Sequence, residues 1–359
     1  MKFSRETLKL SENMTTGFTM PAIAAGNLEG DHLSDKSFKI LQDAGINLVN
    51  CDKVQISEKA KDMADRRNIG LCSVENNILP LGKDENFADY ENNLRKYCQD
   101  SGAKLLSFVN PLYSNIYEGK MTKDEAYRNF VTNAALVNKL SKEFNIPYWG
   151  SVQAGGNFEL HGAQTKKYYP SDSEFLWMVN LYLAAGAKGI QYYPLIEQNA
   201  TMENGESDLD RNGILGADKL PTIYWSYART ANEQLRDAGP MLIQSRSEAL
   251  IATGEMAELL DGVEGVATKD IKFRQLKSIE SSQKGVIIGC LDFKHRTGFY
   301  IVNCDLERRR EVTLNFDGPQ TVVVTQLGNK QSNKKEESVT LGLQAGGAAL
   351  VYLWKHLGD

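Results

Sequence analysis

Residues 146–198 read IPYWGSVQAGGNFELHGAQTKKYYPSDSEFLWMVNLYLAAGAKGIQYYPLIEQ, a pattern of strand, polar loop, helix and strand. The first part, 146–152, is an apolar and aromatic run with the composition of a strand that is buried on both faces. Apolar residues then recur at helical spacing over 175–185, and Gly186 ends the predicted helix. Residues 187–194 form a second strand that ends in aromatic residues. This βαβ unit predicts a parallel sheet, in which functional sites lie at the carboxyl ends of the strands.

The composition of the 359-residue chain limits its partners. Hydrophobic residues make up 42% of the chain and charged residues 24%, as is typical of globular proteins. A net charge of −5 gives no basic surface for nucleic acid. No apolar run approaches the roughly 18 residues that a membrane helix needs. We therefore expect neither nucleic acid nor a membrane as a partner, and the oligomeric state is not predicted.

The cysteines and the N-terminus bear on localisation. Five cysteines are scattered without a CxxC pair, so neither a zinc site nor a disulfide framework is predicted. The acidic loop 203–213 lacks EF-hand spacing, and we predict no metal and no cofactor. The first residues, MKFSRETLKLSENMTTG, lack the apolar core of a signal peptide. The protein is expected to be cytoplasmic if this N-terminus is natural, and secreted or periplasmic if a leader was removed.

Strands and helices alternate from the start of the chain to about residue 240. Strands are predicted at 21–26, 46–52, 69–76 and 103–111, with helices between them and a long helix at 122–144. No glycine-rich phosphate-binding motif follows an early strand, which disfavours a nucleotide-binding sheet. The repeat predicts an α/β fold with a TIM-type (β/α)8 barrel over residues 1–244. The helix at roughly 220–237 is expected to end at Gly239 and Pro240.

The pattern changes near residue 245. Short β-branched runs separated by turn residues take over, including 310–316 and 320–327 on either side of Asp317-Gly318. The charged residues 333–338 are interpreted as the exposed end of a hairpin. A small antiparallel β-sandwich is predicted over residues 245–359.

Several motifs together resemble a family of bacterial glycoside-hydrolase-like proteins distantly related to family 42 β-galactosidases. The motifs are SFVNPLYS (107–114), IPYWGSVQAGG (146–156), LAAGAKGIQYYPL (183–195), DENFADYENNLRKY (84–97) and GVIIGCLDFKHRTGFYIVNCDL (285–306). The resemblance spans most of residues 20–354. It implies a barrel with a C-terminal β-sandwich and a carbohydrate substrate such as a β-linked galactoside or related glycan.

Two stretches are shorter than the resemblance implies. The family has a helix and a strand between Val74 and Asp84, and a further strand between Ser114 and Arg128. A parallel crossover needs about ten residues or more, including a helix, so the first of these connections cannot be regular. Either the barrel is abridged or irregular, or segments of the natural chain are missing from this sequence.

The resemblance places an acid/base glutamate at Glu85. Its neighbour Asp84 would raise the pKa of Glu85 by like-charge proximity. The alternative is that the two form an acidic pair capping the helix that begins near residue 86, which is common at helix starts.

The second carboxylate is harder to assign, because Gln153 stands where related barrels carry a nucleophilic glutamate. An amide cannot attack an anomeric carbon, although it can bind a sugar or orient a water. Glu159 and Glu197 are the nearest replacements and Glu75 is a third, and each is equally interpretable as a solvated loop residue. We predict Glu85 and Glu197 as the catalytic pair.

Aromatic and amide side chains near the strand ends are candidates for sugar binding. Flat rings suit the apolar faces of sugars. Because strand side chains alternate, only one of Tyr192 and Tyr193 can face the barrel axis. An amide such as Asn110 is costly to bury unless it is hydrogen-bonded, so it is either a site residue or a hydrogen-bonder of the barrel interior. The predicted binding residues are Asn110, Trp149, Gln153, Glu159, Tyr192 and Tyr193.

Two hypotheses follow for the function. The first is a glycoside hydrolase that cleaves a β-glycosidic bond with two carboxylates about 5–9.5 Å apart. The second is a non-catalytic carbohydrate-binding or scaffold protein on a degenerate hydrolase barrel. A mouth lined only by amides and aromatics would favour the second.

Overall fold

The fold is that of a computed structural model of the chain. Side chains are not described for 157–161, 164–168, 200–201, 207–208, 329 and 334. The described residues are 20–26, 28, 30–51, 57–74, 78–83, 85–155, 157–161, 164–197, 200–201, 207–208, 213–269, 271–293, 296–326 and 329–354.

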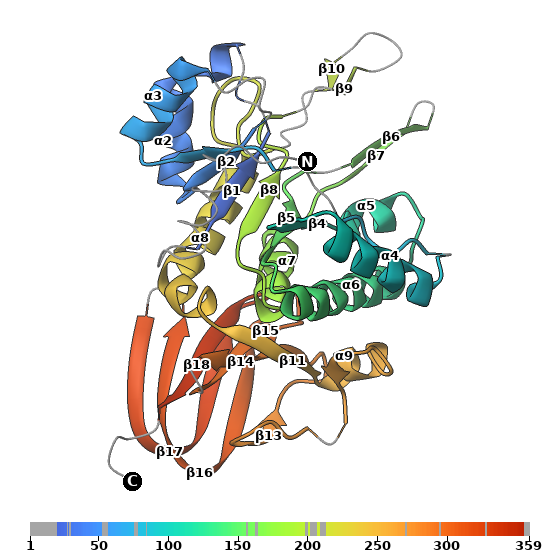
Figure 1. Cartoon of the computed structure of the whole chain (residues 1–359), viewed down its shortest axis with the longest axis vertical. Helices are drawn as coiled ribbons and strands as arrows, with labels where there is room; N and C mark the ends of the chain where they lie inside the picture. The colour runs from blue at the N-terminus through green and yellow to red at the C-terminus, as the bar shows by residue number, and fades with distance from the viewer. Residues whose placement is uncertain are drawn as a thin grey trace.

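The first part of the chain forms a six-stranded parallel sheet in the middle of Figure 1. Its strand order is β3-β2-β1-β8-β5-β4, so the first and last strands of the sheet in sequence, β1 and β8, are neighbours. The strands are β1 (Ala22–Ala25), β2 (Leu48–Asn50), β3 (Gly70–Cys72), β4 (Leu106–Val109), β5 (Tyr148–Gln153) and β8 (Ile190–Tyr193).

Helices connect these strands, as the alternating pattern predicts. Thr122 and Ser171 each form a capping box at the start of a helix, which satisfies backbone N–H groups there. Pro240 lies inside α8 rather than ending it. The helices are η1 (Gly30–His32), α2 (Asp35–Asp43), α3 (Glu58–Arg66), α4 (Phe87–Asp100), α5 (Leu112–Tyr117), α6 (Lys123–Phe144), α7 (Asp172–Ala184) and α8 (Ile223–Leu242).

The sheet is curled but does not close into an eight-stranded barrel within the described residues. β4 pairs directly with β5, because residues 110–147 contain α5 and α6 and no strand. At the other edge of β4, Ile78 forms a single parallel bridge to Phe108. Residues 114–128 lead from α5 into α6 without the further strand that the resemblance implies.

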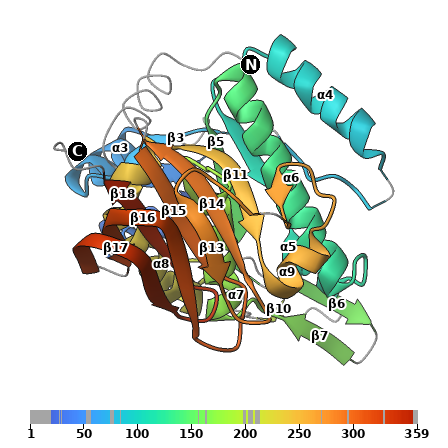
Figure 2. The same ribbon diagram turned by 90° about the horizontal axis from the view of Figure 1, so that it is seen from below.

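The second part of the chain is one eight-stranded sheet, in place of the predicted two-sheet sandwich. Figure 2 shows the strands of this curled sheet from below. Apolar side chains from strands that do not pair with each other, such as Ile301 and Leu314, share one core. A short helix, α9 (Gly254–Leu259), follows its first strand. The strands are β11 (Arg246–Ala252), β12 (Val266–Ala267), β13 (Leu276–Glu280), β14 (Val286–Phe293), β15 (Arg296–Asn303), β16 (Arg310–Gln326), β17 (Asn329–Leu343) and β18 (Ala348–Trp354).

A long bent strand makes this curl possible. Asp317-Gly318 was expected to be a hairpin turn but lies inside β16, where the register with β17 shifts between Asn315 and Gln320. Gly318 has φ +81°, a conformation that favours glycine, as at a β-bulge. The first half of β16 pairs with β13 and the second half with β18. Residues 333–338, expected as a hairpin end, lie within β17.

Helix α7 lies between the two sheets (Figure 1). Its side chains from Phe175 to Ala184 are all buried, as expected of a helix that is apolar on every side. One core cluster joins β8, α7 and the near face of the curled sheet, for example Ile190, Leu181 and Tyr300. The parallel sheet and the curled sheet are therefore packed together through α7.

Lys188 supports the junction at the end of α8. Its Nζ donates to the carbonyl oxygen of Leu242 at 2.7 Å and also to that of Ser245. Burial lowers the pKa of Lys188 to about 8, and the charge of Arg246 acts in the same direction. A lysine in an unfolded chain titrates near about 10.4. Between these values the unfolded chain binds more protons, so the free energy of unfolding rises as the pH rises through this window.

Lys188→Met should abolish the rise of the free energy of unfolding with pH that comes from Lys188. The difference in free energy of unfolding between wild type and Lys188→Met is expected to grow by about 2 kcal/mol between about pH 7.5 and pH 10.5 in urea titrations. Lys284 is a matched control, because its hydrogen bond to Glu255 raises the pKa of Lys284. Its contribution is lost as the pH rises, so Lys284→Met should change the pH dependence in the opposite direction. A Lys188→Met curve parallel to that of wild type would contradict the prediction.

Candidate functional site

The concave face of the parallel sheet is apolar toward the amino ends of its strands. Trp149 is 2% exposed and packs there with residues of four neighbouring strands and connections. A Cβ on Gly189 would lie 2.7 Å from the Trp149 ring, so the indole covers the backbone of the next strand. The members of this apolar cluster are Ile23, Leu48, Cys72, Leu105 and Trp149.

Uncharged polar side chains form the next layer of the concave face. Asn50 donates to Gln191 Oε1 at 3.1 Å and to the carbonyl oxygen of Val74 at 2.7 Å. Because β1 lies between the strands of Asn50 and Gln191, this side-chain contact shows how strongly the sheet is curled. Ser107 and Ser151 are buried in the neighbouring strands. Amides and hydroxyls, rather than charged groups, thus form the layer of the concave face just below the carboxyl ends of the strands, which we call the mouth of the sheet.

Gln153 and Tyr193 are register partners at the carboxyl ends of β5 and β8. Tyr193 is 46% exposed, whereas Tyr192 is fully buried and donates its hydroxyl to Asn232 Oδ1 of α8 at 2.6 Å. Tyr193 is therefore the tyrosine on the concave face, and Tyr192 belongs to the core beneath the helices. Gln153 accepts a long 3.4 Å hydrogen bond from Ser114 and donates to the carbonyl oxygen of Gly155 at 2.9 Å.

Two other predicted binding residues have internal contacts. Trp149 is part of the apolar cluster, so its ring has no face open to a ligand in this structure. Asn110 is 2% exposed and donates to Asn129 Oδ1 of α6 at 3.2 Å. Asn129 in turn donates to the carbonyl oxygen of Leu81 at 2.9 Å. Asn110 thus links β4 to α6 through a hydrogen bond, which agrees with the second alternative, an amide that is hydrogen-bonded inside the protein.

Glu197 is the carboxylate that the structure places just beyond the end of β8. It is 9% exposed, and its Oε2 accepts the backbone N–H of Ala217 at 2.8 Å. Its other oxygen, Oε1, is buried and has no hydrogen-bond partner in the described part of the chain. A buried carboxylate oxygen is costly unless a donor reaches it, so Glu197 is suited to receive a hydrogen bond from a ligand.

Of the other predicted carboxylates, only that of Glu85 lies in the described part of the chain. Glu85 accepts the backbone N–H of Gly82 at 3.1 Å within its own loop. That loop follows Ile78, and β4 and β5 lie between Ile78 and β8 in the sheet. The side chain of Glu159, in β6 (Asn157–His161), and residue Glu75 lie outside the described part.

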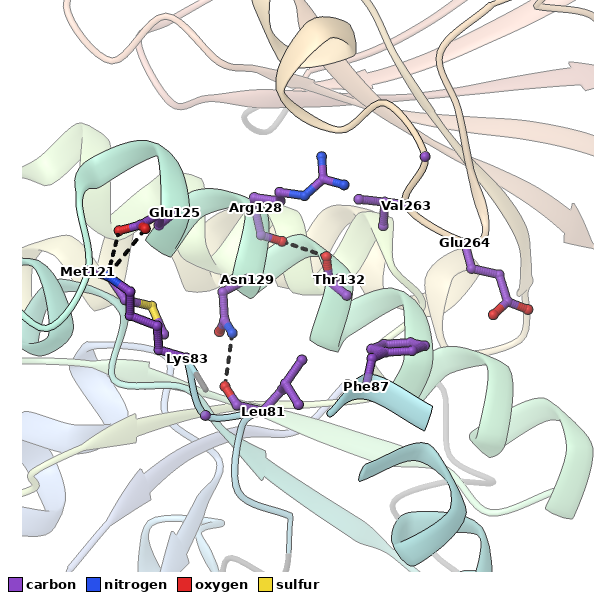
Figure 3. Close-up of a pocket in the computed structure, with 12 residues that line it drawn as sticks. Leu81, Lys83, Phe87, Met121, Glu125, Arg128, Asn129, Thr132, Val263 and Glu264 are labelled. Atoms are coloured by element: carbon purple, nitrogen blue, oxygen red, sulfur yellow. Dashed lines mark hydrogen bonds and ion pairs between the residues drawn. The ribbon is translucent and has the colours of Figure 1, made fainter. Parts of the chain in front are cut away.

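A separate pocket of about 510 Å³ lies beside the loop that carries Glu85 (Figure 3). Leu81 and Lys83 line one side, Arg128 and Thr132 of α6 another, and Val263 the side toward the curled sheet. Lys83 pairs with Glu125 at 3.2 Å, and Arg128 donates to the carbonyl oxygen of Asp261 at 3.0 Å. The cations of this pocket are thus already engaged by the protein.

The concave polar layer includes residues that sequence reasoning missed. Asn50, Ser107 and Ser151 alternate with apolar residues in their strands, and that two-residue period was their available signal. In the described residues, no group of three or more His, Cys, Asp or Glu side chains is arranged to hold a metal ion. No helix in that part of the chain is both long and apolar enough to cross a bilayer.

Comparisons with known proteins give weak structural likenesses. No family model and no curated protein sequence matches the chain. The chain is similar to a glycoside hydrolase family 5 structure from Bacteroides vulgatus, with 10% identity over 94% of this chain and 90% of that one and a TM-score of 0.47. It is also similar to a β-galactosidase from Bacillus circulans sp. alkalophilus, with 7% identity, 95% and 100% coverage and a TM-score of 0.40.

A third likeness is to a GH27 β-L-arabinopyranosidase from Geobacillus stearothermophilus, with 11% identity and a TM-score of 0.35. The match covers 90% of this chain but only 61% of that one, so this chain spans less than two thirds of its length. The three solved structures are glycoside hydrolases, and all three TM-scores lie below 0.5. The likenesses assign no substrate and no catalytic residue to this chain.

Proposed function

We propose that the protein binds a carbohydrate at the carboxyl-terminal end of the parallel sheet. The observation that carries this proposal is the layering of the concave face. An apolar base lies below uncharged amides and hydroxyls, with exposed Tyr193 and buried Glu197 at the mouth. Such a lining suits a sugar, because amides and hydroxyls match its hydroxyl groups and an aromatic ring matches its apolar face.

Tyr193→Ala tests this proposal. Loss of the exposed ring should weaken glycan binding by roughly 5- to 30-fold, equivalent to about 1–2 kcal/mol, without lowering the melting temperature. The measurement is isothermal titration against the neutral β-linked oligosaccharide that binds best in a glycan array. Leu79→Ala is the control, because Leu79 is also exposed but lies after Ile78 rather than β8. Equal losses in the two variants, or no glycan binding by wild type, would refute the proposed site.

Hydrolysis of a β-glycosidic bond is the second candidate function, and Glu197 is the observation that favours it. Its Oε1 is buried and has no partner among the described residues. A hydrolase needs a second carboxylate about 5–9.5 Å away. Glu85 would have to leave Gly82 to supply it, and the side chain of Glu159, the other predicted glutamate, lies outside the described part of the chain.

An assay with aryl β-glycosides separates hydrolysis from binding alone. If the protein is a hydrolase, Glu197→Gln should lower kcat/KM by at least about 100-fold, because the amide can neither attack nor transfer a proton. Glu85→Gln should have a comparable effect only if Glu85 is the acid/base residue. Glu311→Gln, an exposed change in the curled sheet, is the control. Wild type that binds glycans without cleaving any aryl glycoside would establish the non-catalytic alternative.

A further inference from the structure

A single peptide group lies between His32 and Glu197. The carbonyl oxygen of Gly216 is 3.1 Å from His32 Nε2, and the N–H of Ala217 donates to Glu197 Oε2 at 2.8 Å. These two atoms belong to the same peptide bond, so one planar group is hydrogen-bonded from both sides. His32 lies in η1 after β1, and Glu197 lies after β8, so the peptide group joins the connections that follow two neighbouring strands.

The chemistry of these groups fixes the direction of both hydrogen bonds. A carbonyl oxygen can only accept, so His32 Nε2 must carry the hydrogen. Both the neutral ring with hydrogen on Nε2 and the imidazolium can donate, and the charged donor makes the stronger bond. Hydrogen bonds in a chain polarise one another, so a stronger bond to the Gly216 oxygen makes the Ala217 N–H a better donor. A hydrogen bond from His32 to the Gly216 oxygen therefore strengthens the hydrogen bond from Ala217 to Glu197.

Glu197 depends on this donor. Among the described residues, Ala217 N–H is the donor to its carboxylate, and Oε1 has none. Gly213 also lies against this residue, because a Cβ there would come within 3.0 Å of the Glu197 backbone nitrogen. The position of the carboxylate is thus set by the 213–217 segment.

We propose that His32 is a positioning residue for Glu197 and acts through the Gly216–Ala217 peptide group. The hydrogen bond that His32 donates to the Gly216 oxygen strengthens the hydrogen bond that holds the carboxylate. The functional consequence of the proposal, although not the hydrogen-bond relay itself, rests on the proposed carbohydrate site.

The charged groups around His32 belong to the same two connections. Asp31 forms an ion pair with Lys219 at 2.9 Å, which ties η1 to the segment after Gly216 a second time. Asp218 Oδ1 accepts the backbone N–H of Leu220 at 2.9 Å. The pKa of Asp31 is lowered, chiefly by its hydrogen bond to Lys219 and to a smaller degree by the charge of His32. Asp31 therefore carries its negative charge next to His32.

The relay has a direct test in the amide proton of Ala217. In protein labelled with ¹⁵N-alanine, with the signal assigned through Ala217→Ser, this amide should lie further upfield in His32→Ala than in wild type, because the Gly216 oxygen loses its donor. His32→Gln retains an N–H donor, so its Ala217 signal should stay near the wild-type position. Identical Ala217 shifts in wild type and His32→Ala would overturn the proposal.

Glycan affinity provides the functional readout. His32→Ala should weaken binding by about 5- to 10-fold, and His32→Gln should restore it. Lys219→Met breaks the second tie but leaves His32, so it should keep the wild-type Ala217 signal. If wild type binds no glycan, the carbohydrate proposal fails and the Ala217 shift still decides the relay. If glycans bind and the Ala217 shift is the same with and without His32, the relay alone is wrong.

Discussion

Gly289→Ala is expected to destabilise the protein by about 3 kcal/mol or more. A Cβ at this position of β14 would lie 2.2 Å from the carbonyl oxygen of Ala184 and 2.8 Å from its carbonyl carbon. Both atoms belong to the backbone of α7, so no side chain can move aside. The same carbonyl oxygen accepts the Ser247 hydroxyl at 3.1 Å, and a shift of α7 would strain that bond as well.

Urea unfolding followed by circular dichroism measures this loss. Gly82→Ala is the matched control, because a Cβ at Gly82 would meet only the Glu85 side chain, at 3.6 Å. Gly82→Ala should change the free energy of unfolding by no more than about 0.5 kcal/mol. Equal stability of Gly289→Ala and wild type would mean that β14 does not lie against α7 as described.

The sequence predicts the strands and helices of this fold, but it does not predict long-range contacts such as that between Gly289 and α7. In the predicted strands and helices, such as 187–194, apolar residues recur at a regular spacing. The structure has a strand or a helix at each of these predicted segments. Closure of the sheet depends on pairings between distant strands, which no local period encodes. The continuity of β16 through Gly318 was likewise hidden, because a bulge and a turn use the same residues.

The candidate site was only partly predictable for the same reason. Alternation correctly indicated that Tyr192 and Tyr193 face opposite sides, but not which side is concave. In the sequence, Asn110 is an amide at the end of a predicted strand. Its hydrogen-bond partner Asn129 could not be predicted, because Asn129 is on a helix nineteen residues later. The peptide group between His32 and Glu197 joins residues 165 positions apart, and only the pairing of β1 with β8 brings them together.

Asn180→Ala is the second large effect that we expect, a loss of about 3 kcal/mol in the free energy of unfolding. Asn180 of α7 is fully buried and joins the helix to the curled sheet. Its Nδ2 donates to the carbonyl oxygen of Gly346 at 2.9 Å, and its Oδ1 accepts the Tyr300 hydroxyl at 2.8 Å. Alanine would leave both partners buried and unpaired, which costs more than the hydrogen bonds themselves contribute.

A double-mutant cycle with Tyr300→Phe isolates the side-chain pair. Tyr300→Phe removes only the hydroxyl, so it should cost about 1 kcal/mol alone and much less in the Asn180→Ala background. The coupling energy between the two positions should be about 1 kcal/mol, measured as the non-additivity of urea unfolding free energies. Tyr352→Phe is the control, because the Tyr352 hydroxyl pairs with Ser245 and not with α7. Additive losses for Asn180 and Tyr300 would show that the hydrogen bond between them does not stabilise the fold.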